Sequence, residues 1–152
     1  MASAKHALQL QAKDPNFEPR VRESFSRQVV MRTIGATMAR VEPGVIEIRL
    51  PFSEALTQQN GFVHAGIITT IVDSACGYAA LSLTPPDVDV LSVEFKINLM
   101  NPARGDEFVA EGHVLKAGKS LTFCEGKVVA LADGRPPKMI AAMLATIMSR
   151  AI

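Results

Sequence analysis

The chain has 152 residues, of which 48% are hydrophobic and 20% are charged, and its net charge is +1 at neutral pH. This length suits one domain, and the apolar fraction suffices for a core that needs no disulfide. Because acidic and basic residues are mixed along the chain, we expect no basic surface for nucleic acid or a membrane. No run of about 18 apolar residues exists to span a bilayer.

Cysteine and histidine usage narrows the function classes further. Cys76 and Cys124 each lie inside an apolar run, which predicts buried, reduced thiols. The three histidines lie far apart and no HExxH or CxxC motif occurs, so we expect no metal site. The first sixteen residues lack the apolar segment of a signal peptide, which favours a cytoplasmic protein.

The amino-terminal part is expected to hold one helix. Residues 1–18 are polar and contain a helix-breaking Asp-Pro-Asn sequence, so we predict an arm or a short peripheral helix there and a single domain over residues 19–152. Pro19 suits the first position of a helix, and Gly35 suits its end.

The remaining elements are strands around one long helix. Residues 37–42 and 45–50 flank Pro43-Gly44, which is typical of a hairpin turn. Apolar and polar residues alternate over residues 91–99, beginning with Leu91 and Ser92, which predicts a strand there. Turn-forming residues then separate three further predicted strands, at 107–116, 121–132 and 138–149. Hairpin connections of this kind produce an antiparallel sheet.

The segment 66–83 contains no proline and is apolar around most of its circumference, which is typical of a buried helix. At about 100° per residue, one strip of this helix carries small and polar residues: Gly66, Thr69, Thr70, Asp73, Gly77 and Ala80. A buried carboxylate is costly unless something pairs with it or uses it, and the glycines leave room beside it for another molecule. The pattern alone also fits a solvated acid and glycines that permit close packing.

A second feature precedes this helix. Gln58 lies six residues before His64, and Asp73 lies nine residues after it. The first backbone N–H groups of a helix lack intrahelical acceptors and, together with the helix dipole, form a site for an oxyanion. Asp73 would then supply a base or a nucleophile. Motifs of the forms GxGxxG, GxxxxGKS/T and GxSxG are absent, so dinucleotide, P-loop and serine-hydrolase chemistry have no support.

These residues resemble the active-site segment of hotdog-fold acyl-CoA thioesterases, in the branch of the phenylacetate-pathway and hydroxybenzoyl-CoA enzymes. That branch carries an amide residue six positions before a His-Gly-Gly motif and an acid nine positions after the histidine. Gln58, His64 and Asp73 match both intervals. The similarity extends over residues 35–149 and includes the Asn-Pro-Ala sequence that follows strand 91–99.

The resemblance implies an α+β hotdog fold, in which a curved antiparallel sheet of five or six strands wraps around one long buried helix. It also implies a homodimer or a dimer of dimers, with acyl-CoA sites between subunits. Two positions depart from the family pattern. Ala65 replaces the first glycine of His-Gly-Gly, and Gly77 stands where some relatives carry a Ser or Thr that helps to hold the water or the acyl group.

On this resemblance we expect hydrolysis of a small or medium acyl- or aryl-CoA thioester. Coenzyme A is then part of the substrate, and no cofactor is expected. Asp73 would be the nucleophile or the general base, and the N–H of Ala65 or Gly66 would stabilise the developing oxyanion. Gln58 would orient the carbonyl group or the water, and His64 would fix the loop.

Further residues are expected to contact the substrate: Asn60, Phe62, Gly77 and Lys119. Lys119 is the first choice for the CoA phosphates, followed by Arg104, Arg135 and Lys138, with solvated loop charges as the alternative. Phe62 and Tyr78 are either walls of the acyl pocket or part of the core.

Two other functions stay open on the sequence. Hydratases or dehydratases of acyl thioesters share the fold but usually depend on a histidine paired with an acid. A non-catalytic acyl-CoA-binding protein is the other alternative. Product analysis with an enoyl-CoA and a saturated acyl-CoA separates these functions.

Overall fold

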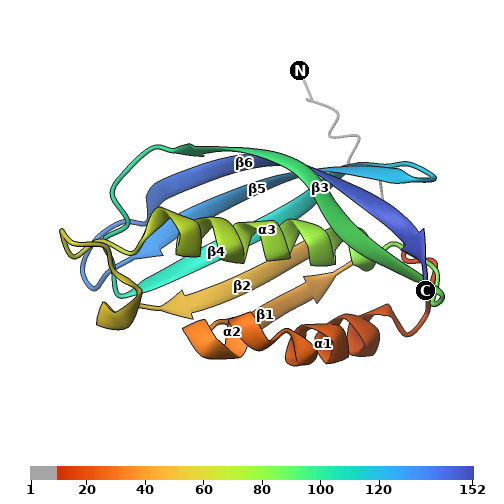
Figure 1. The fold of residues 1–152 in the computed structure, drawn as a ribbon, viewed down its shortest axis with the longest axis horizontal. Helices are drawn as coiled ribbons and strands as arrows, with labels where there is room; N and C mark the ends of the chain where they lie inside the picture. Colours follow the sequence, from red (N-terminus) through yellow and green to blue (C-terminus); the bar gives the residue numbers. More distant parts are fainter. Residues whose placement is uncertain (1–9) are drawn as a thin grey trace, which may run out of the picture.

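A computed structural model describes residues 10–152 (Figure 1). Its elements, in chain order, are α1 (Phe17–Arg27), α2 (Val29–Ile34), β1 (Thr37–Glu42), β2 (Val45–Pro51), the 3-10 turn η1 (Glu54–Leu56), α3 (Ala65–Leu81), β3 (Val88–Leu99), β4 (Glu107–Ala117), β5 (Leu121–Leu131) and β6 (Lys138–Ala151). The strands form one antiparallel sheet in the order β1-β2-β4-β5-β6-β3, curved around α3. The prediction of a curved antiparallel sheet of five or six strands around one long helix is confirmed, with six strands. Between residues 10 and 152, no helix has the length and apolar character needed to cross a bilayer.

Helix α3 rests directly on the middle of the sheet. Its apolar side chains Ile68, Ile71 and Val72 are fully buried against the strands. The helix comes this close because β4 and β5 carry glycines where they cross it. A Cβ atom at Gly112 would overlap the backbone of Ala75, and one at Gly126 would lie 2.5 Å from Val72 Cγ2. The strip that bears Asp73 faces away from the sheet centre and is at least partly exposed from Gly66 to Gly77, whereas Ala80 at its end is buried.

The amino-terminal helix differs from the prediction. A single helix from Pro19 to Gly35 was expected, but two helices form, and the first begins at Phe17. Gln28 separates them because its backbone is extended, with φ −75° and ψ 95°. Gly35 ends the second helix as predicted, with φ 78°. Val21, in the second turn of α1, is fully buried.

Part of the predicted arm packs against the domain. The arm was predicted as residues 1–18, of which residues 1–9 lie outside the described part of the chain. Leu10 packs on the core and sits where a Cβ of Gly44 would be, and the side chain of Asp14 is buried. The division between arm and domain itself stays a prediction.

Arg20 joins α1 to the end of α3. Its Nη2 atom donates to the carbonyl oxygens of Leu81 at 3.2 Å and Thr84 at 2.8 Å, and its Nη1 atom donates to that of Val88 at 3.2 Å. Its Nε lies 2.9 Å from Asp14 Oδ2, which forms an ion pair without hydrogen-bond alignment. The guanidinium group therefore links the Leu81 carbonyl at the end of α3 to the Thr84 and Val88 carbonyls of the segment that leads into β3.

Strand β3 forms one edge of the sheet and pairs only with β6 within the described chain. Three of its apolar side chains, Leu91, Val93 and Phe95, are 44–50% exposed. A β-bulge between Ser92 and Glu94 puts Ser92 opposite the buried Ile147, on the face toward α3. A long edge strand with exposed apolar side chains is a surface that another chain can cover.

Candidate active site

The start of α3 presents one free backbone donor. His64 is the N-cap residue, with an extended backbone at φ −60° and ψ 138°, and its Nδ1 accepts a hydrogen bond of 2.8 Å from the Gly66 N–H. Its carbonyl oxygen accepts from the N–H groups of Ile67 and Ile68. The N–H of Ala65 makes no hydrogen bond with any residue of 10–152. Of the two N–H groups predicted for an oxyanion, that of Gly66 is engaged by the histidine ring and that of Ala65 is open.

A tight turn holds Gln58 beside this helix start. The Gln58 N–H donates to the Phe62 carbonyl at 2.8 Å, and Gly61 supplies the φ of 80° that the turn requires. The Asn60 N–H donates to the side-chain oxygen of Gln58. The amide oxygen of Gln58 is therefore used inside the loop, and its NH2 group remains as a donor.

These residues open onto a cavity of about 450 Å³, which we call the helix-start cavity. Its lining includes Gln58, Phe62, His64 and Ala65, so the structure brings these four predicted residues together. Asn60 is not part of the lining. Arg104 lies above the Phe62 ring, with its Cζ 5.2 Å from the ring centroid, as in a cation–π contact.

Asp73 belongs to a second cavity, of about 260 Å³, which we call the Asp73 cavity. Residues from α1, α3 and β3 line it, among them Ser24, Gln28, Asp73, Gly77, Tyr78 and Ser92. Asp73 Oδ1 accepts a hydrogen bond of 2.8 Å from Ser92 Oγ, and the carboxylate forms no ion pair within residues 10–152. Burial raises the pKa of Asp73, and the Ser92 hydrogen bond opposes part of that rise.

The two cavities are separate within one chain. Ala65 and Asp73 are eight residues apart on α3, and an α-helix rises about 1.5 Å per residue, so about 12 Å of helix axis separates them. An oxyanion donor must lie within about 3 Å of the carbonyl oxygen, and a base that acts through one water must lie within about 6 Å of the carbonyl carbon. One copy of the chain therefore cannot place both groups at one thioester.

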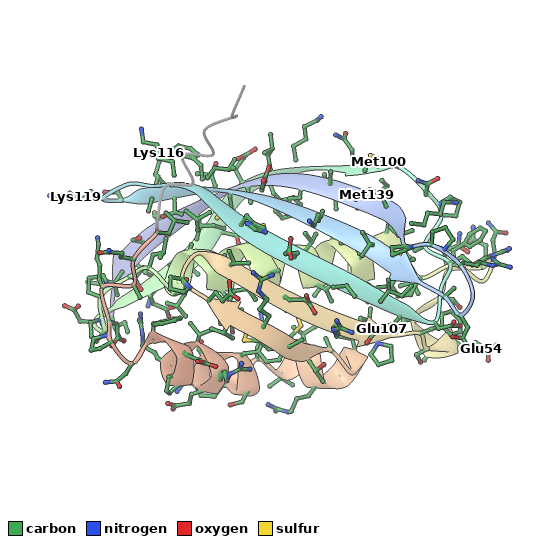
Figure 2. All side chains as sticks on the ribbon, turned by 180° about the vertical axis from the view of Figure 1, so that it is seen from behind. Glu54, Met100, Glu107, Lys116, Lys119 and Met139 are labelled. Carbon is green, nitrogen blue, oxygen red and sulfur yellow. The ribbon has the colours of Figure 1, made fainter. Side chains whose placement is uncertain are left out.

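The predicted cations divide between the two ends of the sheet. Lys119 sits at the tip of the β4–β5 hairpin, and Met100 and Met139 mark the opposite end in Figure 2. Lys119 shares a cavity of about 570 Å³ with Lys13 and Arg150, next to the carboxyl end of α3. The structure therefore does not bring Lys119 to the helix-start cavity of its own chain.

The other three predicted cations, Arg104, Arg135 and Lys138, line one cavity of about 340 Å³. None of them forms an ion pair with a carboxylate in the described part of the chain. Arg104 also contacts Phe62, so this cationic cavity adjoins the helix-start cavity.

Several residues of the Asp73 cavity were not singled out from the sequence, among them Ser24, Gln28 and Ser92. Ser24 and Gln28 come from α1 and its end, and no local pattern indicates which cavity that helix approaches. Ser92 reaches Asp73 because the β-bulge turns it toward α3, whereas simple alternation groups it with Glu94.

The two cysteines are buried free thiols, as predicted. Burial raises the pKa of both Cys76 and Cys124, which keeps them protonated and unreactive. Over residues 10–152, no three His, Cys, Asp or Glu side chains gather as metal ligands would.

A curved antiparallel sheet wrapped around one helix, with open cavities along that helix, is the hotdog architecture. Residues 60–136 match the thioesterase superfamily. A thioesterase family protein from Silicibacter pomeroyi superposes with a TM-score of 0.87 at 46% identity, covering 90% of this chain and 99% of that one. Human acyl-coenzyme A thioesterase 13 is 32% identical over 100 residues, which is 65% of this chain and 71% of that protein.

The E. coli PaaI protein, from the phenylacetic acid degradation operon, shares the fold with a TM-score of 0.77 at 16% identity, covering 90% of this chain and 94% of that one. The chain belongs to the thioesterase superfamily and is a thioester hydrolase. The resemblance drawn from Gln58, His64 and Asp73 is thereby confirmed at the level of the family. The roles of these individual residues stay predictions.

Proposed function

We propose that this chain hydrolyses acyl-CoA thioesters to a carboxylic acid and free CoA. The observation that carries the proposal is Asp73, a partly buried carboxylate that lines a cavity and has no cation partner among residues 10–152. CoA as the thiol is supported by the relative that is named an acyl-coenzyme A thioesterase. No cofactor takes part, because water and a carboxylate suffice for the reaction.

In the first step, the thioester carbonyl oxygen accepts a hydrogen bond from the Ala65 N–H. Asp73 takes a proton from water while the water oxygen attacks the carbonyl carbon. The oxyanion collapses, the C–S bond breaks, and the CoA thiolate takes the proton from Asp73. The Gln58 NH2 group donates to the carbonyl or to the water, and His64 positions the loop through its bond to Gly66.

A second route has the Asp73 carboxylate attack the carbonyl carbon directly. The thiolate then leaves first, and water hydrolyses the resulting anhydride. A single turnover in oxygen-18 water separates the two routes. Label on Asp73 after that turnover identifies the nucleophilic route, because water that attacks the Asp73 carbonyl of the anhydride leaves its oxygen there, whereas the general-base route puts the label in the product and never on Asp73.

We further propose that two copies build each site. A twofold axis beside Thr69, midway between Ala65 and Asp73, sets Asp73 of one copy opposite Ala65 of the partner subunit. The exposed strip of α3 and the apolar edge strand β3 support this contact. The expected mass in solution is a multiple of the 16.3 kDa chain, beginning at a dimer.

A dimer of dimers would use a further surface, and the outer face of the sheet offers one. Phe123 and Leu144 on that face are 44% and 57% exposed. Light scattering at several concentrations distinguishes a dimer from a tetramer, and a monomer at all concentrations would contradict the shared site.

The CoA phosphates are assigned to Arg104, Arg135 and Lys138. Their charges are not neutralised by neighbouring carboxylates within residues 10–152, and Arg104 links their cavity to the helix-start cavity. A chain of contacts thus leads from the Ala65 N–H past Phe62 to three cations. Polyanion binding by such a group is expected to weaken with added salt.

Free-thiol release from a panel of acyl-CoAs tests the proposed function. Asp73→Asn should lower turnover by about 10² to 10⁴-fold. Asp87→Asn, which changes an exposed acid in the turn before β3, is the matched control and should leave turnover unchanged. Near-normal release by Asp73→Asn would contradict the mechanism.

The same assay distinguishes the hydratase alternative. An enoyl-CoA that gains water without releasing thiol would support it. The histidine–acid pair that such enzymes use is formed here by His113 and Glu111, at 2.8 Å, but both side chains point away from α3, because Gly112 between them faces that helix.

A further inference from the structure

The outer face of the sheet, which points away from α3, is hollowed across its middle. Gly112 and Gly126 face the helix, since a Cβ at either position would strike it, and Met143 on β6 is buried on the same side. Side chains alternate along a strand, so the residues on either side of these three lie on the outer face. A cavity of about 540 Å³ opens there, and its lining includes Glu111, His113, Glu125, Lys127, Ala142 and Leu144.

The strand register arranges these six side chains in two parallel rows. Read across β4, β5 and β6, the first row is His113, Glu125 and Leu144, and the second row is Glu111, Lys127 and Ala142. Each strand therefore carries two outer-face residues of contrasting character, two positions apart. They are an imidazole and an acid on β4, an acid and a base on β5, and a large and a small apolar side chain on β6.

Two such rows are complementary to a second copy of themselves. A twofold axis that runs between the rows, perpendicular to the strands, sets the first row of one copy against the second row of the other. Glu125 then faces Lys127 of the partner subunit, and Lys127 faces Glu125 of the partner subunit. An axis along β5 would instead set the two Glu125 side chains against each other, and such like-charge contacts cost free energy.

The charges on β5 are available for this contact. Glu125 is exposed and forms no ion pair within residues 10–152. Lys127 Nζ lies 2.8 Å from Glu111 Oε1, but the lysine side chain is 50% exposed and its ammonium group has further donors. Stacked sheets lie about 10 Å apart, a gap that a glutamate and a lysine side chain span together. Each contact between two copies thus gains two ion pairs.

The strands on either side of β5 fit the same axis. Leu144 is 57% exposed and meets Ala142 of the partner subunit, whose small side chain leaves room for it in the cavity. On β4, the His113 ring meets the carboxylate of Glu111 of the partner subunit. Apolar side chains thus pack beside paired polar groups, which is the usual composition of a subunit contact.

We infer that the outer face binds a second copy of this chain through β4, β5 and β6, about a twofold axis that runs between the row of Glu125 and the row of Lys127. The inference goes beyond the proposed hydrolysis and assigns contact residues to the dimer of dimers. An axis along the rows is perpendicular to one that relates two β3 edges within a sheet. Perpendicular twofold axes that meet give a closed dimer of dimers.

Charge reversal tests the register of the contact. Glu125→Lys sets the new lysine against Lys127 of the partner subunit, and Lys127→Glu sets the new glutamate against Glu125 of the partner subunit. Sedimentation velocity over a dilution series of the full-length chain should show the dissociation constant raised at least about tenfold in each variant. In an equimolar mixture, unlike copies regain both attractive pairs, so the constant should return to within about threefold of the wild type.

Two further variants control for charge and for folding. Glu54→Lys makes the same charge change in η1, at one end of the molecule (Figure 2), and should leave the dissociation constant unchanged. Leu144→Ala removes apolar contact without a change of charge and should raise the constant at least about tenfold. It serves if Lys127→Glu, which loses the ion pair with Glu111 of its own chain, folds poorly.

A dissociation constant that neither Glu125→Lys nor Leu144→Ala changes would overturn the inference, as would a mixture that associates no better than its two components. Thiol release separates this result from the proposed function. Glu125→Lys should hydrolyse acyl-CoA at the wild-type rate, because the helix-start cavity and the Asp73 cavity do not include the outer face. Absence of hydrolysis by the wild type would overturn the proposed function and leave the contact between copies unaffected.

Discussion

The open N–H of Ala65 can be removed with little other change to the backbone. Ala65 is the first residue of α3, and proline is well tolerated at this position because its missing N–H has no intrahelical acceptor. The preceding residue must be extended, and His64 already has ψ 138°. Ala65→Pro should therefore fold like the wild type and lose only the donor proposed for the oxyanion.

The expected loss in kcat depends on whether the neighbouring Gly66 N–H can replace the donor that is removed. Removal of one oxyanion donor typically costs about 3–4 kcal/mol, which is about 10² to 10³ in kcat. The Gly66 N–H cannot replace the lost group, because it donates to His64 Nδ1 at 2.8 Å. We therefore expect the upper part of this range, with a smaller change in KM than in kcat.

Steady-state thiol release measures the effect, and Ala65→Gly is the matched control because it keeps the N–H. The control should stay within about tenfold of the wild type, since a more mobile helix start affects only positioning. Thermal unfolding of both variants checks the fold. An Ala65→Pro enzyme with normal kcat and an unchanged melting temperature would refute the assignment of this N–H.

Three further predictions follow from the same geometry. Subunit exchange between Ala65→Pro and Asp73→Asn should restore about one quarter of wild-type activity, because half of the dimers are mixed and each has one intact site; no recovery would contradict the shared site. Because the pKa of Asp73 is raised, kcat/KM should fall at acid pH with an apparent pKa above 3.8, the ordinary value for an aspartate. The fold also favours the protonated carboxyl group, so Asp73→Asn should raise the melting temperature at pH 7, and this gain should disappear at acid pH. Gly112→Ala should destabilise by about 1–3 kcal/mol, whereas Gly77→Ala should stabilise by up to about 1 kcal/mol in the same denaturation assay.

The main elements of the fold were predictable because their signals are local. A proline-free apolar segment becomes α3, and Pro43-Gly44 forms the β1–β2 hairpin with Gly44 at φ 76°. The break at Gln28 was not predictable, since glutamine is an ordinary helix former. With this break, Val21 and Met31 on either side of it are both fully buried.

The candidate site likewise has a part that local sequence predicts and a part that depends on tertiary structure. Gln58, His64 and Ala65 are close in sequence, so their spacing alone brings them to one cavity. The bond from the Gly66 N–H to the His64 ring depends on one side-chain rotamer, which spacing does not specify. The polar wall from α1 depends on tertiary packing across some fifty residues of chain, from Gln28 to Tyr78.

If two copies build each site, as proposed, the edge of β3 that has no partner strand within residues 10–152 sets a condition on how much protein must be present. A chain on its own holds the acid and the oxyanion donor too far apart to cooperate, so diluted chains are expected to be silent even though each is fully folded. Turnover per chain is then expected to rise with protein concentration until dimer formation is complete. Under the proposed shared site, the concentration of the protein itself would control the reaction without a separate effector.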